Sequence, residues 1–420
     1  MTGKQKLVQA LDHNGGPVPV DFGSTATTGM HVSVVEALRK HYGLEDRPVK
    51  VNEPYQMLGE VEPDLREAMG ADVVGVHPRG TFFGFPLGDW KEWQTPWGQN
   101  VLVPGDFNVT MDGNDVLIYP EGDMSVPPSG RMPEGGFFFD SIIRQEPIDD
   151  DNLDPEDNCE EFGPISQEEL DHLAKETAKA REIGCGVIAN FGGTGFGDIA
   201  LVPGPFLKYP KGIRDVAEWY MSTAMRKDYV HAVFSKQLEY VLENLPKIKD
   251  AVGDGIDAVF LCGTDFGTQE GQFCSPDTFR ELWLPYYRQM TDWIHANTDW
   301  KCFKHCCGSI VPLLDCFIEA GFDIMNPIQC SAAGMKPEML KSQYGDKLTF
   351  WGGGVDTQHT LPFGSPDEVR SQVRNRCEVF AQDGGFVFNA IHNVQAKCPI
   401  ENIVAMLETV REFNNKLARS

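Results

Sequence analysis

Short apolar runs alternate with longer helical patterns through the second half of the sequence, and this alternation constrains the fold more than any other feature. Apolar runs bounded by Gly, Asp or Asn are typical of buried strands. We expect strands at Gly186–Phe191, Ile256–Cys262, Trp300–Cys306, Phe322–Asn326, Leu348–Gly352 and Phe386–Asn389. We expect helices at Ser166–Ile183, Asp215–Leu245, Ser275–Asn297, Ile310–Ala320, Lys336–Tyr344, Pro366–Asp383 and Glu401–Asn414.

Regular alternation of strands and helices predicts a parallel sheet, because parallel neighbours need a long crossover between them. An earlier strand is expected at Ala71–Val76, and with the terminal helices it completes a plausible set of eight units. No G-x-G-x-x-G pattern follows the first strand, so a dinucleotide-binding sheet is not favoured. We therefore predict an α/β fold, a TIM (β/α)8 barrel, formed as a single domain over residues 1–420.

The segment from about residue 89 to residue 165 departs from this pattern. Its first part, Asp89–Phe139, sets aromatic and β-branched residues between Gly, Pro and Asp, which predicts short strands joined by turns. An acidic stretch follows, Gln145–Ala174, which holds twelve acidic residues and no Lys or Arg. We interpret the segment as a β-rich N-terminal elaboration of the barrel that leads into a solvated acidic insertion.

The net charge excludes two classes of partner. The chain holds 62 acidic and 36 basic residues, which gives a formal net charge of −26. Nucleic-acid binding depends on clustered Lys and Arg that replace the counterions of phosphate, and anionic membrane surfaces attract basic segments. A strongly acidic chain would be repelled by both surfaces, so we expect no nucleic-acid partner and no membrane partner.

The cysteines and the first residues indicate a compartment. Eleven cysteines, an odd number in a chain of 420 residues, do not resemble the disulfide framework of a small secreted domain. The opening MTGKQKLVQALDHNGG lacks the apolar core of a signal peptide, and no apolar run reaches the length of about 18 residues that a membrane span needs. We expect a cytoplasmic protein whose thiols are mostly free or bound to a metal.

Polar residues gather at the ends of the predicted strands, where a TIM barrel carries its reactive groups. Asn190 lies at the end of one strand, and Asp265 and Gln269 follow another. His305 follows a third strand, and His392 follows the last one. These strand ends supply the candidate site residues.

His305 and Cys307 form the most informative pair among them. In an extended segment, residues two apart point to the same side, so these two side chains should converge while Cys306 points away. An imidazole and a thiolate that meet at one point suit Zn²⁺, which accepts both nitrogen and sulfur ligands. The pair therefore predicts a zinc site at the barrel mouth.

A third ligand must come from another strand end. His392 lies three strands later and could face His305 across the mouth. Cys398 is the rival, because a thiolate is the better zinc ligand by type, but it abuts Pro399 at the start of the last helix. The residues favour His392, and Cys398 stays open as the alternative.

Three motifs resemble the uroporphyrinogen decarboxylase superfamily over roughly the last 240 residues, with a looser likeness before them. They are H-C-C-G at His305–Gly308, D-F-G-T-Q-x-G-x-x-x-S-P at Asp265–Pro276, and F-N-A-I-H-N…P-I-E-N from Phe388 to Asn402. The resemblance implies a TIM barrel and two branches: metal-free decarboxylases, and zinc methyltransferases that act with a corrinoid. The second branch includes methylcobamide:coenzyme M methyltransferases and demethylating relatives.

The resemblance favours the methyltransferase branch. The decarboxylases carry an Arg-rich N-terminal segment that holds an acidic tetrapyrrole, whereas the first 45 residues here contain Arg39 alone. The methyltransferases carry His-x-Cys and a distant Cys, and His305 and Cys307 match the first two. This chain departs from the family by placing His392 at the third position, which puts thiol activation in doubt. One thiolate leaves a formal charge of +1 on zinc, which favours demethylation of an O-methyl substrate such as an aromatic ether.

The resemblance also implies roles and partners. Asp265 would orient a zinc-bound histidine or contact substrate, and Asn190 and Gln269 would hydrogen-bond substrate. For Tyr55, Trp90, Trp93 and Trp97 the residue types favour aromatic packing, and an apolar lid is the alternative. The methyl group of a small methylated substrate would pass to the Co(I) corrinoid of a separate protein, because this chain has no D-x-H-x-x-G signature. Methylation of a thiol such as coenzyme M, a porphyrinogen decarboxylase and a non-catalytic barrel that binds a corrinoid protein are the alternatives, and a homodimer stays open.

Overall fold

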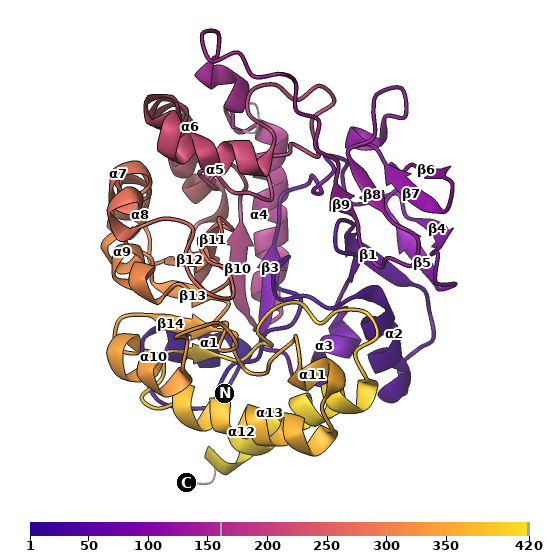
Figure 1. Cartoon of the computed structure of the whole chain (residues 1–420). Helices are drawn as coiled ribbons and strands as arrows, with labels where there is room; N and C mark the ends of the chain where they lie inside the picture. The colour runs from indigo at the N-terminus through magenta and orange to yellow at the C-terminus, as the bar shows by residue number, and fades with distance from the viewer. Residues whose placement is uncertain (160–161, 418–420) are drawn as a thin grey trace.

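Seven parallel strands form the central sheet of the protein. The computed structural model describes residues 1–159 and 162–417. The sheet has the order β15-β14-β13-β12-β11-β10-β3 and curves through the left half of Figure 1. Its strands are β3 (Val73–Val76), β10 (Gly186–Asn190), β11 (Ala258–Cys262), β12 (Lys301–His305), β13 (Ile324–Asn326), β14 (Thr349–Trp351) and β15 (Phe386–Val387). Each lies within a stretch that the sequence predicted as a strand, so the α/β barrel prediction is confirmed.

The segment of residues 18–22 fills the eighth place, between β15 and β3. Val20 forms a parallel bridge with Phe388, and the Asp21 amide donates to the Phe388 carbonyl at 2.9 Å. On the other side the Asp72 amide donates to the Val20 carbonyl at 2.7 Å. This short segment closes the barrel, although the sequence analysis did not recognise it as a strand.

Helices surround the sheet and follow its strands in chain order. They are α4 (Gln167–Glu182), α5 (Val216–Met225), α6 (Lys227–Val252), α7 (Pro276–Leu282), α8 (Leu284–Asn297), α9 (Leu314–Glu319), α10 (Pro337–Tyr344), α11 (Thr360–Phe363), α12 (Pro366–Phe380) and α13 (Ile400–Leu417). Two predicted helices are each broken into two. Arg226 leaves the helical region at φ −126° and ψ 46°. Trp283, at φ −109°, immediately precedes α8, whose second residue, Pro285, has no amide hydrogen to donate.

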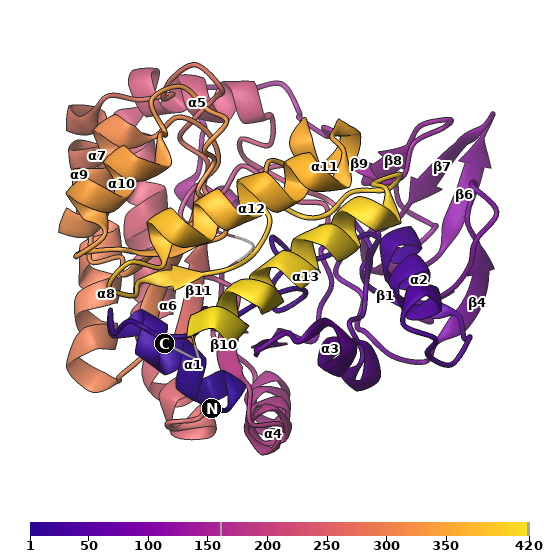
Figure 2. The same ribbon diagram turned by 90° about the horizontal axis from the view of Figure 1, so that it is seen from below.

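The N-terminal helix α1 (Gly3–Leu11) closes the lower end of the barrel (Figure 2). Its buried Leu7 and Leu11 pack into a cluster with inward-facing strand residues such as Ile188, Phe303 and Trp351. Because the amino ends of the strands are covered by this helix, the polar strand ends lie at the opposite mouth. No helix among the described residues combines the length and the apolar character that a membrane crossing requires.

The N-terminal elaboration contains two four-stranded sheets, seen at the right of Figure 1. One has the order β2-β1-β5-β4 and the other β6-β7-β8-β9. The elaboration begins at β1, well before residue 89, and is joined to the barrel through α2 and α3. The bounds are β1 (Val49–Glu53), β2 (Leu58–Gly59), β4 (Lys91–Gln94), β5 (Asn100–Val103), β6 (Val109–Asp112), β7 (Asp115–Ile118), β8 (Gly130–Met132), β9 (Asp140–Ser141), α2 (Val32–His41) and α3 (Pro63–Met69).

The acidic stretch is less free than the sequence predicted. A short 3₁₀ helix, Pro155–Asn158, packs on α6. The buried Asn158 side chain accepts from the Ile213 amide at 2.7 Å and donates to its carbonyl at 2.9 Å. Glu160 and Glu161, which belong to the predicted insertion, lie outside the described residues. The segment Pro155–Asn158 is therefore attached to the barrel rather than wholly solvated.

Candidate metal centre

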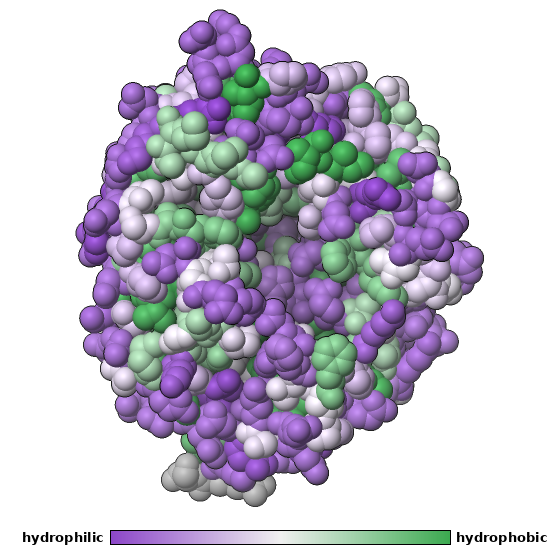
Figure 3. Space-filling model, viewed as in Figure 1, coloured by the Kyte–Doolittle hydropathy of each residue, from purple (hydrophilic) through white to green (hydrophobic). Residues whose placement is uncertain are grey.

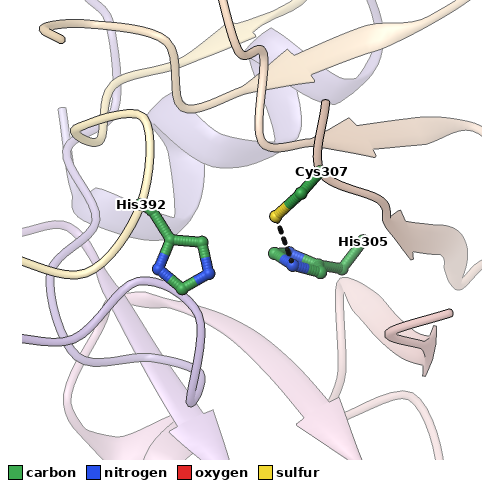
Figure 4. A group of neighbouring side chains, drawn as sticks. All are labelled: His305, Cys307 and His392. Carbon is green, nitrogen blue, oxygen red and sulfur yellow. Dashed lines mark hydrogen bonds between the residues drawn. The ribbon is translucent and has the colours of Figure 1, made fainter. Parts of the chain in front are cut away.

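His305 and Cys307 converge at the carboxyl end of β12. His305 is the last residue of the strand and is 5% exposed. Its Nε2 lies 3.4 Å from the Cys307 Sγ, and Figure 4 shows the two side chains pointing toward one another. A tetrahedral zinc ion holds a nitrogen and a sulfur ligand about 3.5 Å apart, given Zn–N near 2.05 Å and Zn–S near 2.3 Å. The pair therefore has the separation that one shared zinc ion would impose.

The neighbouring thiol takes no part in this pair. The Cys306 side chain is fully buried, and its Sγ accepts from the Phe266 amide at 3.2 Å. Alternation along the extended chain thus places Cys306 on the side away from His305, as the sequence predicted.

His392 completes a group of three possible ligands. It lies on the loop after β15, and its ring centroid is 5.4 Å from that of His305 at an angle of 75°. One ligand atom from each of His305, Cys307 and His392 lies within 4.8 Å of the others. Cys398, the rival third ligand, is not in this group; its Sγ contacts the Leu361 carbonyl at 3.5 Å.

Asn326, at the end of β13, fixes the tautomer of His305. The Asn326 Nδ2 donates to the Trp351 carbonyl at 2.9 Å, so its Oδ1 faces His305 as an acceptor. The His305 Nδ1 lies 2.6 Å from that oxygen and must carry the ring proton to donate to it. The lone pair of His305 is therefore on Nε2, the atom that faces Cys307, which is the arrangement that metal-binding histidines require.

The tautomer of His392 is less suited to metal binding than that of His305. Its Nδ1 accepts from the Asn393 amide at 2.8 Å, and its other ring nitrogen faces His305 and Cys307 (Figure 4). The neutral ring consequently carries its proton on Nε2. A metal bound at Nε2 would require that proton to move to Nδ1 and the bond from Asn393 to break. Only His305 thus faces the centre in the form that a metal needs, whereas the His392 ring must change its tautomer.

Burial sets the protonation of all three groups. Removal from water lowers the pKa of His305 and of His392 to about 4, so both rings are neutral near pH 7. Burial also raises the pKa of the Cys307 thiol well above its usual range. A metal must therefore displace the thiol proton as it binds, which is the usual coupling between metal binding and ligand ionisation.

Asp265 contacts this centre through Cys307. Its Oδ1 accepts from the Cys307 amide at 2.6 Å and lies 4.0 Å from the His305 Nε2. Burial raises the pKa of this carboxyl group. The sequence predicted that Asp265 would orient a zinc-bound histidine or contact substrate. In the structure Asn326 holds His305 and Asp265 holds the backbone of Cys307, and a contact of Asp265 with substrate stays a prediction.

The other predicted site residues are spread around the mouth. Asn190 ends β10, and its Oδ1 accepts from the Gly192 amide at 2.9 Å. Gln269 is exposed on the loop after β11. Tyr55 packs in the elaboration, with its ring 4.4 Å from that of Phe82. The roles of Asn190 and Gln269 as substrate contacts stay predictions, and Tyr55 lies among aromatic neighbours.

The three tryptophans of the predicted lid also have neighbours within the elaboration. The Lys50 ammonium lies 5.6 Å from the Trp90 ring, and the rings of Trp93 and Trp97 lie 5.0 and 5.1 Å from those of Phe107 and Phe137, respectively. Figure 3 shows the surface hollowed near the middle of this face, with polar and apolar residues around the hollow.

The fold and these contacts define a class of protein: a TIM-type barrel with a candidate His, Cys and His metal centre at the carboxyl ends of its strands. Residues 205–413 match the family model of uroporphyrinogen decarboxylase (URO-D). Over these residues the chain belongs to the uroporphyrinogen decarboxylase superfamily.

Curated relatives match nearly half of the chain. A uroporphyrinogen decarboxylase from Hydrogenovibrio crunogenus is 23% identical over 215 residues, and one from Pseudoalteromonas translucida is 24% identical over 215 residues. Each match covers 47% of this chain and 57% of the relative, so the chain spans little more than half the length of the curated relatives it matches.

A solved structure matches nearly the whole chain. A methyltransferase from Methanosarcina mazei superposes with a TM-score of 0.54 at 14% identity, and the match covers 98% of this chain and 99% of that one. At this identity the likeness concerns the fold, and it includes the N-terminal elaboration as well as the barrel.

Proposed function

We propose that this protein is a zinc-dependent methyltransferase that moves a methyl group from a small methylated substrate, an O-methyl ether in our preferred form, to the Co(I) corrinoid of a separate protein. The observation that carries the proposal is the convergence of His305, Cys307 and His392 within 4.8 Å at the barrel mouth. A metal-free decarboxylase has no use for a thiol and two neutral imidazoles at that point.

The arginine distribution supports the same choice. A decarboxylase of an acidic tetrapyrrole needs exposed cations in its cavity to hold the substrate carboxylates. Arg39 is only 4% exposed, and its guanidinium pairs with Asp64 at 2.9 Å and with Glu62 at 3.4 Å. The one arginine of the first 45 residues is therefore committed to the protein itself.

The proposed ligands fit zinc by chemistry and by separation. His305 and Cys307 would hold it through Nε2 and Sγ, with His392 as the third ligand, and bound zinc supplies a Lewis acid for the substrate heteroatom. The donor set carries one thiolate and two neutral rings, so it leaves residual positive charge, which suits an ether oxygen that leaves as an anion.

The chain's own residues account for the rest of the arrangement. Asn326 keeps the His305 lone pair on Nε2, and Asp265 fixes the Cys307 backbone. The Phe260 ring lies 6.4 Å from the His305 ring at 28° and gives the mouth an apolar wall. The net reaction balances as R–O–CH₃ plus Co(I) plus a proton giving R–OH and CH₃–Co(III).

Zinc content and methyl transfer test the proposal together. Purified protein should contain about one zinc per chain, and His305→Ala or Cys307→Ala should lose both the metal and activity. Cys306→Ala is the matched control, because this adjacent thiol points away from the centre, and it should keep the metal. Methylation of cob(I)alamin by a panel of methyl ethers, methylamines and thioethers is followed by the change in the corrinoid absorption spectrum.

Two outcomes would overturn the proposal. Full activity in a metal-free protein would refute the zinc site, and no cobalamin methylation with any donor by a zinc-loaded protein would refute the methyl transfer. Release of CO₂ from a porphyrinogen by the metal-free protein would instead place the chain with the decarboxylases.

A further inference from the structure

Lys304 is a fully buried lysine beside the proposed metal ligands, and the proposed function does not use it. Its exposure is 0%, and no ion pair within 4 Å among the described residues involves it, although the buried carboxylates of Asp198 and Asp265 interact with its charge from farther away. The ammonium instead donates to the Thr264 carbonyl at 2.6 Å and to the His305 carbonyl at 2.8 Å. It also lies 5.1 Å from the centre of the Phe266 ring.

Burying a charge without a counter-ion in contact is costly, and an apolar residue of similar size would generally serve the fold as well or better. Packing alone therefore does not explain the presence of a lysine at this position. Its two carbonyl partners indicate the reason, because one belongs to a proposed metal ligand and the other precedes Asp265, which holds Cys307.

The lysine acts where the regular pairing of β11 and β12 stops. The pair Cys262 and Lys304 is the last one in that ladder, and the register is already irregular there. Beyond it, residues 264–268 and 304–309 are joined by side-chain and loop contacts, which we call the seam. Lys304 provides the first of these, because its ammonium connects the carbonyls of Thr264 and His305 where no ladder bond does.

The rest of the seam follows directly. The Asp265 carboxylate accepts from the Cys307 amide at 2.6 Å, and the Ser309 amide donates to the Thr268 carbonyl at 2.7 Å. Gly308 has φ +91°, and a Cβ there would lie 2.4 Å from the carbonyl carbon of Gly267. Only glycine permits this approach, so the two motifs D-F-G-T and H-C-C-G are the two edges of one seam.

We propose that Lys304 is a positioning residue for the metal centre, which fixes His305 and the Asp265–Cys307 contact in the geometry that a metal needs before the metal arrives. This inference rests on the proposed zinc site. It predicts that the lysine affects metal affinity more than it affects folding.

The test compares Lys304→Met with Lys341→Met. Lys341, on α10, also donates to a backbone carbonyl, that of Gly384 at 2.7 Å, but it lies next to the chain that leads into β15 at the opposite end of the barrel. Zinc affinity is measured on folded, metal-free protein by competition with a chelating dye. We expect Lys304→Met to bind zinc about 10- to 100-fold more weakly than wild type and Lys341→Met to bind it normally. The absorption spectrum of the cobalt(II)-loaded protein should also change only in Lys304→Met.

The outcomes separate this inference from the proposed function. If wild type binds no zinc, the proposed function fails first. If wild type binds zinc and Lys304→Met binds it equally with an unchanged cobalt spectrum, the positioning role is refuted and the proposed function stands. If Lys304→Met does not fold, hydrogen exchange in metal-free wild type decides. Slow exchange of the Cys307 and Ser309 amides supports a preformed seam, and exchange as fast as in an exposed loop refutes it.

Discussion

Replacement of Asn326 by alanine should separate metal binding from folding at this centre. Asn326 is fully buried, its Oδ1 accepts from His305 Nδ1 at 2.6 Å, and its Nδ2 donates to the Trp351 carbonyl at 2.9 Å. The alanine variant leaves one buried donor and one buried acceptor unpaired. At about 1–3 kcal/mol for each group, the metal-free protein should lose about 2–6 kcal/mol of unfolding free energy.

The same substitution should act on the metal through the histidine. Without the Asn326 oxygen, the His305 ring is free to turn and to place its proton on Nε2, the atom that must be deprotonated to bind zinc. Loss of such an outer partner typically lowers metal affinity about 10- to 100-fold, which equals about 1.4–2.7 kcal/mol. The stabilisation that saturating zinc adds to folding should shrink by that amount.

Asn402→Ala is the matched control for this prediction. Asn402 is 1% exposed, and its Nδ2 donates to the carbonyls of Leu361 and Gly364, each at 2.8 Å. Its loss also removes two hydrogen bonds of a buried side chain, although the Leu361 carbonyl keeps its contact with Cys398 Sγ, so its metal-free stability should also fall. Urea unfolding with and without zinc, together with dye competition, measures both quantities. Equal zinc affinities for the two variants would refute the role that we assign to Asn326.

Three further results should follow from the structure. Cys398→Ala should keep its zinc, because Cys398 Sγ contacts the Leu361 carbonyl, and loss of the metal on dialysis against a weak chelator would instead favour it as the third ligand. Burial lowers the pKa of His31 to about 4, so the stability that the neutral ring contributes is complete above pH 6.5 and is lost as the pH falls toward 4. In urea titrations, the unfolding free energy of wild type relative to His31→Asn should therefore fall by about 2 kcal/mol between pH 7 and pH 5. Burial raises the pKa of Glu53 to about 7, so its ionisation destabilises the fold as the pH rises from 4.5 through 7. The unfolding free energy of Glu53→Gln relative to wild type should therefore rise by about 2 kcal/mol between pH 5 and pH 8. Parallel plots of unfolding free energy against pH for the two proteins would contradict this.

The sequence predicted the barrel because its strands are buried on both faces and therefore read as continuous apolar runs. The segment in the eighth place of the barrel was not predicted, because it is not a continuous apolar run. Residues 18–22 contain Pro19, make one bridge to Phe388, and lie far in sequence from the other strands. The helix breaks at Arg226 and Trp283 were not predicted for a different reason. The apolar pattern continues across both residues, whereas the helix does not.

At the candidate site, local patterns were predictable and distant partners were not. Two-residue periodicity placed His305 and Cys307 side by side, and the structure brings them within 3.4 Å. Asn326 could not be assigned to His305 in the same way, because 21 residues separate them and their contact depends on the parallel pairing of β12 and β13. A lysine within an apolar strand likewise does not indicate which backbone carbonyls its ammonium will contact.

The position of His392 depends on residues 18–31, the part of the barrel whose structure was least predictable from the sequence. Asn393, its neighbour, accepts from the Gly29 amide at 2.6 Å and donates to the Ala26 carbonyl at 2.8 Å. Asn389, at the start of the same loop, donates to the Asp21 carbonyl at 2.6 Å, within the strand that closes the barrel. His305 thus ends a central strand and Cys307 follows it two residues later, whereas the loop of His392 is held by the N-terminal segment. Closure of the barrel and completion of the metal centre are therefore coupled. A disturbance of residues 18–31 should reach the metal through His392 and also through His305, because the Thr27 hydroxyl donates to the Asn326 Oδ1 at 3.3 Å.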